Sequence, residues 1–305
     1  MARAQVGTES TGAARIARAA GALVLLLGGL AGSCQPALPP GAGFRWSPYG
    51  PPPGEDPGPA YWSEVADEMA DRFDGFRPRG IWVACEVDFG SGGCWLDYDG
   101  DGDAVDPLIR FTGNPVDATE VALAEFDARG VEVWLQIEPG FASVEELIHL
   151  LLDRYGHHPS VLGVGVDVEW HRNAAEPALG EPVTDAQAAA WRRAVGEHGT
   201  HRLFLKHWLI GHMPPTDRRG IVFIDDSQGF PDLDALVAEA AQWSAEFGTS
   251  PVAFQIGYES DRIWWEDLPD PPARIGDALG AAVPNLKGLY WVDFTALDIF
   301  PPPGS

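Results

Sequence analysis

Cysteine and basic residues are scarce in this chain of 305 residues. There are three cysteines, so cysteine chemistry is not expected to be the mechanism. The 20 Lys and Arg face 45 Asp and Glu, which gives a formal net charge of -25. Such a charge argues against nucleic acid as a partner and is compatible with a neutral polymer or a cationic ligand. We interpret the acidity chiefly as a means of keeping an exported protein soluble.

Long apolar runs are also lacking, and the run at residues 19–30 is too short to cross a membrane comfortably. It follows Arg3, Arg15 and Arg18 and ends in small residues before Cys34, which is the layout of an export signal. Residues 31–34, Ala-Gly-Ser-Cys, resemble a bacterial lipobox, in which the cysteine is lipidated and becomes the new N-terminus. We therefore expect a lipoprotein signal peptide over residues 1–33 and an exported protein, at the cell surface or in the periplasm, anchored to the membrane only through Cys34. A plain secretory signal is the alternative.

Residues 34–60 have little to bury. They contain Pro39-Pro40, Pro51-Pro52-Pro53 and several glycines, a composition typical of a stiff tether. The folded domain is therefore expected over residues 61–305. Cys85 and Cys94, the two cysteines within it, would close a short loop in an oxidising compartment, and we predict a disulfide between them.

Short apolar runs alternate with helical patterns along the rest of the chain. Seven runs have the length and composition of strands; they lie at 80–88, 131–138, 161–169, 202–207, 221–226, 251–258 and 287–294. An eighth strand is expected at 108–111, between the first two. Apolar strands separated by helices predict a parallel sheet covered on its outside, and eight such units predict an α/β protein with a single-domain (β/α)8 TIM barrel. The link at 209–220 is too short for a full helix.

The segment 161–170 carries the clearest chemical signal. It has the pattern of a buried strand that ends by presenting Asp167 and Glu169. Because alternate residues of a strand point the same way, the two carboxylates share one face and the valines between them face the other. A like charge nearby raises the pKa of one carboxyl group, which then stays protonated near neutrality. We expect Glu169 to be a general acid and Asp167 its partner.

Polar and aromatic residues recur where the other strands end. In a barrel of this kind the carboxyl ends of the strands meet at one face, which carries the active site in enzymes of this fold. Flat aromatic rings suit the faces of sugars, and carboxylates and amides suit their hydroxyls. We therefore expect a carbohydrate-binding pocket lined by Glu86, Glu138, Trp170, Lys206, His207, Asp226, Gln255, Tyr258, Trp291 and Asp293.

Two further features bear on cofactors. Asp97, Asp99 and Asp101 have the spacing of a calcium loop, although the twelfth position is Leu108 and not glutamate. A structural calcium is one option and a solvated acidic loop the other; no other cofactor is expected. Lys206 lies among acids and is expected to position groups through ion pairs and not to form a Schiff base. The adjacent histidines 157 and 158 precede a proline in a turn and need no metal.

The segment 161–170 resembles a degenerate form of the Asp-Gly-x-Asp-x-Asp-x-Glu signature of family 18 glycoside hydrolases, which are (β/α)8 barrels. Glu169 falls on the catalytic acid of that family and Asp167 on the aspartate two residues before it, whereas Gly165 and Leu162 stand where the earlier aspartates would be. Trp291 resembles the tryptophan at the floor of the family's sugar site. The resemblance implies that Glu169 protonates the glycosidic oxygen while an N-acetyl group of the substrate, oriented by Asp167, attacks the anomeric carbon.

Other mechanisms and functions stay open. A retaining barrel with its nucleophile after the seventh strand would use Glu169 and Glu259, and Asp225 or Asp226 is another second acid. A non-catalytic lipoprotein that binds glycan would keep the pocket without cleaving bonds. A metal-dependent hydrolase built on Glu138, Asp167, Glu169 and Asp225 is weaker, because no His pair has ligand spacing at the strand ends. The leading hypothesis is a monomeric, exported glycoside hydrolase that cleaves a polysaccharide or a cell-wall glycan.

Overall fold

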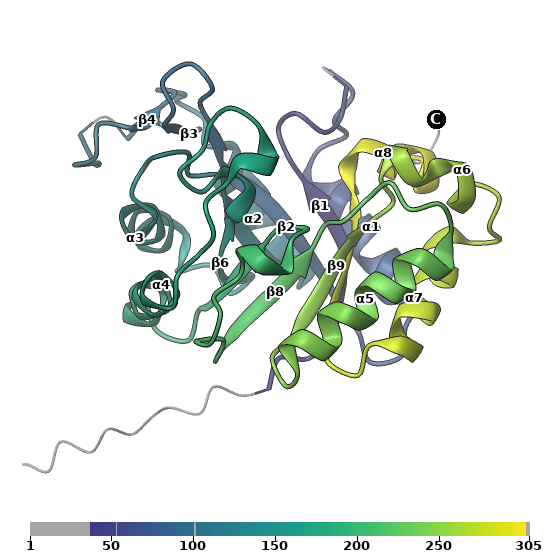
Figure 1. Cartoon of the computed structure of the whole chain (residues 1–305). Helices are drawn as coiled ribbons and strands as arrows, with labels where there is room; N and C mark the ends of the chain where they lie inside the picture. Colours follow the sequence, from purple (N-terminus) through teal and green to yellow (C-terminus); the bar gives the residue numbers. More distant parts are fainter. Residues whose placement is uncertain (1–36, 53, 101, 303–305) are drawn as a thin grey trace, which may run out of the picture. The chain divides into compact units, whose positions relative to one another are not determined.

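The structure, a computed structural model, describes residues 37–52, 54–100 and 102–302 (Figure 1). Eight parallel strands of the described chain form a barrel: β1 (Gly41–Trp46), β2 (Arg77–Val87), β5 (Glu132–Ile137), β6 (Val161–Asp167), β7 (Arg202–Lys206), β8 (Ile221–Asp225), β9 (Val252–Ile256) and β10 (Leu286–Val292). β1 pairs with β2 on one side and with β10 on the other, so the sheet closes on itself. The predicted (β/α)8 barrel is therefore confirmed.

Helices follow most of the strands and cover the outside of the barrel (Figure 1). They are α1 (Pro59–Ala70), α2 (Ala118–Arg129), α3 (Val144–Tyr155), α4 (Asp185–Glu197), α5 (Leu233–Phe247), α6 (Arg262–Trp265), α7 (Pro271–Ala282) and α8 (Asp293–Ile299). Side chains that accept a backbone N–H cap the first turns of α2, α3, α4 and α5; these are Asp117, Ser143, Thr184 and Asp232. Between β7 and β8 the chain forms the short 3-10 helix η3 (Ile210–His212), as the short link predicted.

Side chains of the strands alternate between two apolar layers. The inner layer is a cluster contributed by strands and by Leu38, and it includes Ile81, Trp134, Phe204 and Tyr290. The outer layer joins strands to helices and contains the valines of β6. Gly165 makes room for the inner layer, because a Cβ at that position would lie 1.9 Å from the ring of Phe204. The barrel interior is thus filled by side chains, and the open face at the strand ends is what remains for a ligand.

The first barrel strand lies in the segment that was predicted to be a tether. β1 contains Gly41 and Gly43, and both are needed: a Cβ on Gly43 would lie 2.1 Å from the backbone oxygen of Arg79, and one on Gly41 would lie 2.6 Å from its guanidinium. On the opposite face Phe44 is fully buried, with its ring centroid 5.4 Å from that of Trp62. The barrel therefore begins at Gly41 and not at Tyr61, so the predicted 34–60 tether is wrong from Gly41 onward.

The strand expected at 108–111 exists but is not part of the barrel. β4 (Ile109–Phe111) pairs with β3 (Cys94–Leu96), which folds back antiparallel on the end of β2. Figure 1 shows this β3–β4 excursion standing off the barrel. Because β1 takes the place of one missing strand ahead of β2, β6 is still the fourth strand of the barrel, as predicted.

The predicted disulfide is not formed in the structure, in which Cys85 and Cys94 are both buried free thiols. Antiparallel pairing sets Cys85 opposite Leu96 and Cys94 opposite Val87, so the cysteines are diagonal neighbours. Diagonal Cβ atoms lie up to about 7 Å apart, against about 3.8 Å in a disulfide. Burial raises the pKa of the Cys85 thiol, which keeps it protonated and unreactive.

The predicted signal peptide, with Cys34, lies outside the described residues. Within the part of the chain that the structure describes, none of the helices combines the length and the apolar character needed to cross a membrane.

We expect a chain that starts at Tyr61 to fail to fold, because loss of β1 leaves the facing edges of β2 and β10 unpaired and uncovers the apolar surface around Trp62. A chain that starts at Gln35 keeps the strand and should melt cooperatively. Circular dichroism melts and gel filtration of the two chains make the comparison. A cooperative melt of the shorter chain, equal to that of the longer one, would show that β1 is dispensable.

Candidate active site

Lys206 is the centre of the candidate site. It is the last residue of β7, and its side chain is 4% exposed. Its Nζ lies 2.9 Å from an oxygen of Asp167, 2.5 Å from one of Glu169 and 2.7 Å from one of Asp226. Asp167 ends β6 and Glu169 follows it, whereas Asp226 follows β8; these are the strands on either side of β7. Barrel topology therefore brings together residues that are distant in the sequence, and one cation is shared by three acids.

Asp167 is held by further hydrogen bonds. Its Oδ2 accepts a bond from Gln136 Nε2 at 3.1 Å, and its Oδ1 accepts one from the backbone N–H of Glu169 at 3.2 Å. The second bond caps the 3-10 helix η1 (Val168–Trp170), so Glu169 lies in a turn and not in the strand. Both carboxyl groups nevertheless reach the same pocket, as the alternation of the segment predicted.

A second charged network contains Arg45 of β1 and Glu138, the residue after β5. The Arg45 guanidinium donates to Asp293 Oδ1 at 3.2 Å and lies 3.8 Å from Glu138 Oε1. Tyr49 donates a hydrogen bond from its hydroxyl to Glu138 and accepts one from Arg45. Ser47 donates from its hydroxyl to Asp293 at 2.7 Å. One nitrogen of the Arg45 guanidinium is held by Asp293, and the other faces Glu138.

The two networks meet in a hollow of about 310 Å³ at the carboxyl ends of the strands. That volume lies at the lower end of the range for small-molecule sites. Eight of the residues predicted from the sequence line it: Glu86, Glu138, Asp167, Glu169, Trp170, Lys206, Asp226 and Tyr258. Six further lining residues were not predicted, namely Arg45, Tyr49, Val87, Phe89, Gln228 and Phe294.

The carboxyl groups of the pocket differ in their affinity for protons. Burial, followed by the charges of Asp167 and Asp226, raises the pKa of Glu169 well above its usual range. Burial opposes ionisation of Asp226 as well, but Lys206 and a hydrogen bond from Glu169 lower its pKa. Of these two carboxyl groups, Glu169 therefore keeps a proton more readily and Asp226 ionises more readily. Burial and Asp167 also raise the pKa of Glu138 to about 7.

Two predicted catalytic acids are not in the pocket. Glu259 lies in the 3-10 helix η4 (Glu259–Asp261), where its side chain is 67% exposed and pairs with Arg262 at 2.7 Å. The chain turns at Gly257, which has a φ of 86°, so that Tyr258 faces the pocket and Glu259 faces solvent. Asp225 is buried, but its carboxylate accepts two hydrogen bonds from Ser227, and the neighbouring Asp226 takes the inward position.

Four predicted binding residues are buried beside the pocket and do not line it. Trp291 belongs to the outer apolar layer, where its indole packs against Trp265, because Tyr290 takes the inward position on β10. His207 stacks on His212, and burial, with His212, lowers its pKa to about 3. Two others support their neighbours: Gln255 accepts a bond from Tyr258, and Asp293 holds Arg45. The family 18 floor tryptophan therefore has no counterpart in Trp291.

Two of the six residues that sequence reasoning missed, including the only cation among them, come from the segment taken for a tether. Arg45 belongs to β1, and Tyr49 lies in the loop directly after it. The sequence signal for this strand was alternation. Gly41, Gly43 and Arg45 share one face, and the apolar Ala42 and Phe44 share the other, which is a strand pattern with small residues on its inner side. Phe89 and Phe294, exposed aromatic residues after β2 and β10, have no comparable signal.

The predicted calcium loop is only partly described, because Asp101 lies outside the described residues. Asp97 and Asp99 are both exposed. Asp97 accepts hydrogen bonds from the side chains of Thr112 and Asn114, the first at 2.7 Å. A structural calcium there remains a prediction.

Comparison with known proteins assigns the chain to no family. No family model matches the chain, and no curated protein matches it. Similar solved structures include a Bacteroides thetaiotaomicron protein assigned as an α-L-fucosidase (10% identity, TM-score 0.49, 85% of this chain and 88% of that one). They also include a Pseudomonas stutzeri endoglucanase (14%, 0.48, 84% and 89%) and a family 18 chitinase from Pseudoalteromonas aurantia (10%, 0.44, 84% and 94%). At these TM-scores the similarities carry no argument about function, which therefore depends on the site itself.

Proposed function

We propose that this protein hydrolyses glycosidic bonds, with Glu169 as the general acid. The observation that carries the proposal is the convergence of Asp167, Glu169 and Asp226 on Lys206 in a pocket at the carboxyl ends of the strands. There burial raises the pKa of Glu169, whereas Lys206 lowers that of Asp226. A general acid must hold its proton at working pH and face the leaving group. Phe89 and Trp170, whose rings are 5.2 Å apart at the pocket wall, supply aromatic surface for the face of a sugar.

Glu138 is the second carboxyl group of the proposed mechanism and takes the place predicted for Glu259 or Asp225. A pKa of about 7 suits a base that loses its proton near neutrality. In this role Glu138 accepts a proton from water while the water oxygen bonds to the anomeric carbon. The bond from that carbon to the leaving oxygen breaks as Glu169 gives its proton to the oxygen. Asp167 and Asp226 hold Lys206, and Lys206 in turn positions Glu169.

A chain of sugars is the substrate we propose, because a second hollow adjoins the pocket. This hollow, of about 460 Å³, shares Asp226 and Gln228 with the pocket and adds Trp208, Leu209 and Phe230. A further sugar unit could stack on the indole of Trp208 while the scissile bond lies at Glu169. A polysaccharide or a cell-wall glycan is therefore favoured over a single small glycoside.

Release of reducing ends tests the proposal. The protein is incubated with chitin, peptidoglycan glycan, neutral glucans and galactans, and new reducing ends are measured. Cleavage of one polymer would identify the substrate class. Saturable binding to a glycan without cleavage would instead identify a glycan-binding protein that retains the pocket. If the protein neither binds nor cleaves any glycan of the panel, a carbohydrate function is contradicted.

The pH profile should be bell-shaped, because Glu138 must be deprotonated and Glu169 protonated. We expect kcat/KM to rise with pH through an apparent pKa of about 7 for Glu138 and to fall at higher pH as Glu169 loses its proton. The hydrogen bond from Tyr49 lowers the pKa of Glu138, so Tyr49→Phe should move the acidic limb to higher pH. An acidic limb that does not move in Tyr49→Phe would mean that a group other than Glu138 is the base.

Export and lipid anchoring through Cys34 remain proposals supported by the apolar run at 19–30 and the lipobox-like residues 31–34. Expressed in a bacterium with its signal, the wild-type protein should partition with membranes. The Cys34→Ala variant should be released from the membrane fraction or remain unprocessed. Equal membrane association of both proteins, with the signal removed from both, would count against the lipid anchor.

A further inference from the structure

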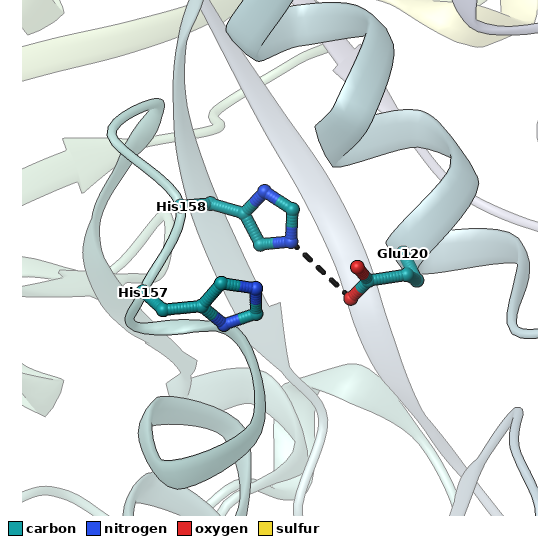
Figure 2. Close-up of side chains that lie close together, drawn as sticks. All are labelled: Glu120, His157 and His158. Carbon is teal, nitrogen blue, oxygen red and sulfur yellow. Dashed lines mark ion pairs between the residues drawn. The ribbon is translucent and has the colours of Figure 1, made fainter.

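A cluster of three potential metal ligands lies away from the active site, at the opposite end of β6. His157 and His158 occupy the loop between α3 and the start of β6, whereas Asp167 closes the strand at its other end. Glu120, in the first turn of α2, lies beside the loop (Figure 2). One ligand atom of each of these residues lies within 4.8 Å of the other two, and this is the one such group of His, Cys, Asp and Glu among the described residues.

The ring of His158 is held in the orientation that a metal ligand needs. Its side chain is 6% exposed, and its Nδ1 lies 2.6 Å from Asp127 Oδ2. Asp127 is itself fixed, because it accepts the backbone N–H of Ser160 at 2.9 Å. A carboxylate can only accept, so Nδ1 carries the hydrogen, and in the neutral ring the lone pair is on Nε2. A carboxylate behind a histidine is the usual support of a metal-bound imidazole.

His157 is set up in the same way by a different acceptor. Its Nδ1 lies 2.9 Å from the backbone oxygen of Arg154, which again can only accept. The lone pair of the neutral ring is therefore also on Nε2. Figure 2 shows the Nε2 atoms of both rings on the side of Glu120, and the ring centroids are 4.2 Å apart. Two adjacent histidines thus present the same atom toward one carboxylate.

The contact between His158 and Glu120 is close but is not a hydrogen bond. Nε2 lies 3.2 Å from Glu120 Oε2, yet this buried nitrogen has no hydrogen-bond partner among the described residues. The lone pairs of His158 Nε2 and Glu120 Oε2 are therefore both available to a metal ion bound between the two atoms. The alternative is a protonated His158 that bridges two acids. Burial lowers the pKa of His158, but Asp127 and Glu120 outweigh burial and raise it above its usual value.

From this geometry we propose that Glu120, His157 and His158 form a binding site for a divalent transition-metal ion, with zinc as the ion that fits best. Two imidazole nitrogens and one carboxylate oxygen are a common zinc ligand set, and a water molecule would complete the tetrahedron. Hard ions such as calcium and magnesium prefer oxygen ligands only. Bound zinc would tie the start of α2 to the loop before β6, so the proposed role is structural and is independent of the glycosidase proposal.

Zinc binding is measured on the untagged protein by competition with a fluorescent zinc chelator, beside thermal melts with and without zinc. We expect one zinc ion per chain, a rise in melting temperature on addition of zinc, and weaker binding at lower pH as His158 is protonated. Glu120→Gln and His157→Ala alter solvent-accessible side chains and should each weaken binding about 100-fold or more. Glu125→Gln changes a half-exposed glutamate of the same helix that pairs with Arg129, and this variant should bind zinc as the wild type does.

Two outcomes would overturn the site. The wild type could fail to bind zinc at neutral pH, which would leave His158 as an ion-paired residue. Alternatively, Glu120→Gln and His157→Ala could bind zinc as tightly as the wild type, which would place the metal elsewhere, for example on the thiols that both variants retain.

Discussion

Glu169→Gln is expected to lower the rate of glycan cleavage by about 100-fold to 10,000-fold, the usual contribution of a general acid. The substitution keeps the shape of the side chain and removes the proton that the leaving oxygen must receive. Affinity for the glycan should change little, because the aromatic wall of Phe89 and Trp170 is intact. Initial rates and binding isotherms on the polymer identified by the panel would separate the two effects.

Glu259→Gln is the matched control, because sequence reasoning placed Glu259 in the same mechanism. The structure puts this glutamate on the surface, paired with Arg262. Its substitution should leave kcat and KM unchanged. Loss of activity in Glu259→Gln equal to that in Glu169→Gln would mean that η4 moves into the pocket when substrate binds, and the proposed roles would have to be revised.

Lys206→Met should be the most destabilising substitution in the pocket, at about 3–5 kcal/mol of unfolding free energy at neutral pH. The variant leaves Asp167, Glu169 and Asp226 buried together without the cation that all three contact. The pKa values of Asp167 and Glu169 then rise further above those of the unfolded chain, and the pKa of Asp226 is no longer lowered by Lys206. Stability is therefore retained at low pH and lost as the pH rises. Urea unfolding at several pH values would measure the effect.

Lys287→Met provides the comparison for that measurement, since Lys287 is the other lysine of the chain and lies half-buried on β10. It has no ion pair with the pocket acids, and its loss should cost less than about 1 kcal/mol. If Lys206→Met unfolds with the same free energy as the wild type at neutral pH, the three carboxyl groups are not held by Lys206, and the order of protonation proposed for Glu169 loses its basis.

Seven of the eight barrel strands could be predicted because their apolar runs are short, continuous and bounded by turn residues. β1 could not, because two of the three residues on its inner face, Gly41 and Gly43, are glycine. Together with the nearby prolines, Gly41 and Gly43 gave the segment the composition of a stiff tether. The passage of Arg79 beside both glycines explains why side chains are excluded there. The error carried forward to the site, since Arg45 and Tyr49 belong to the same segment.

The alternation rule was reliable within strands and failed just beyond them. Asp167 and Glu169 reach one pocket even though a 3-10 turn begins between them. At the end of β9 the same rule pointed to Glu259, but the left-handed backbone at Gly257 rotates the chain and sends that side chain outward. Backbone reversals after a strand depend on tertiary contacts, here the close approach of Trp291 to Gly257, which sequence spacing does not reveal.

Closure of the barrel by β1 has a consequence for folding. β1 can pair early with β2, but Gly41 also pairs with Gly288, so the other edge of this first barrel strand waits for a partner that is synthesised about 250 residues later. Such a contact order slows folding and postpones the last step until synthesis is nearly complete. For a protein that crosses a membrane unfolded, as the proposed export requires, late closure is an advantage: the N-terminal segment cannot lock into a finished barrel before β10 has emerged.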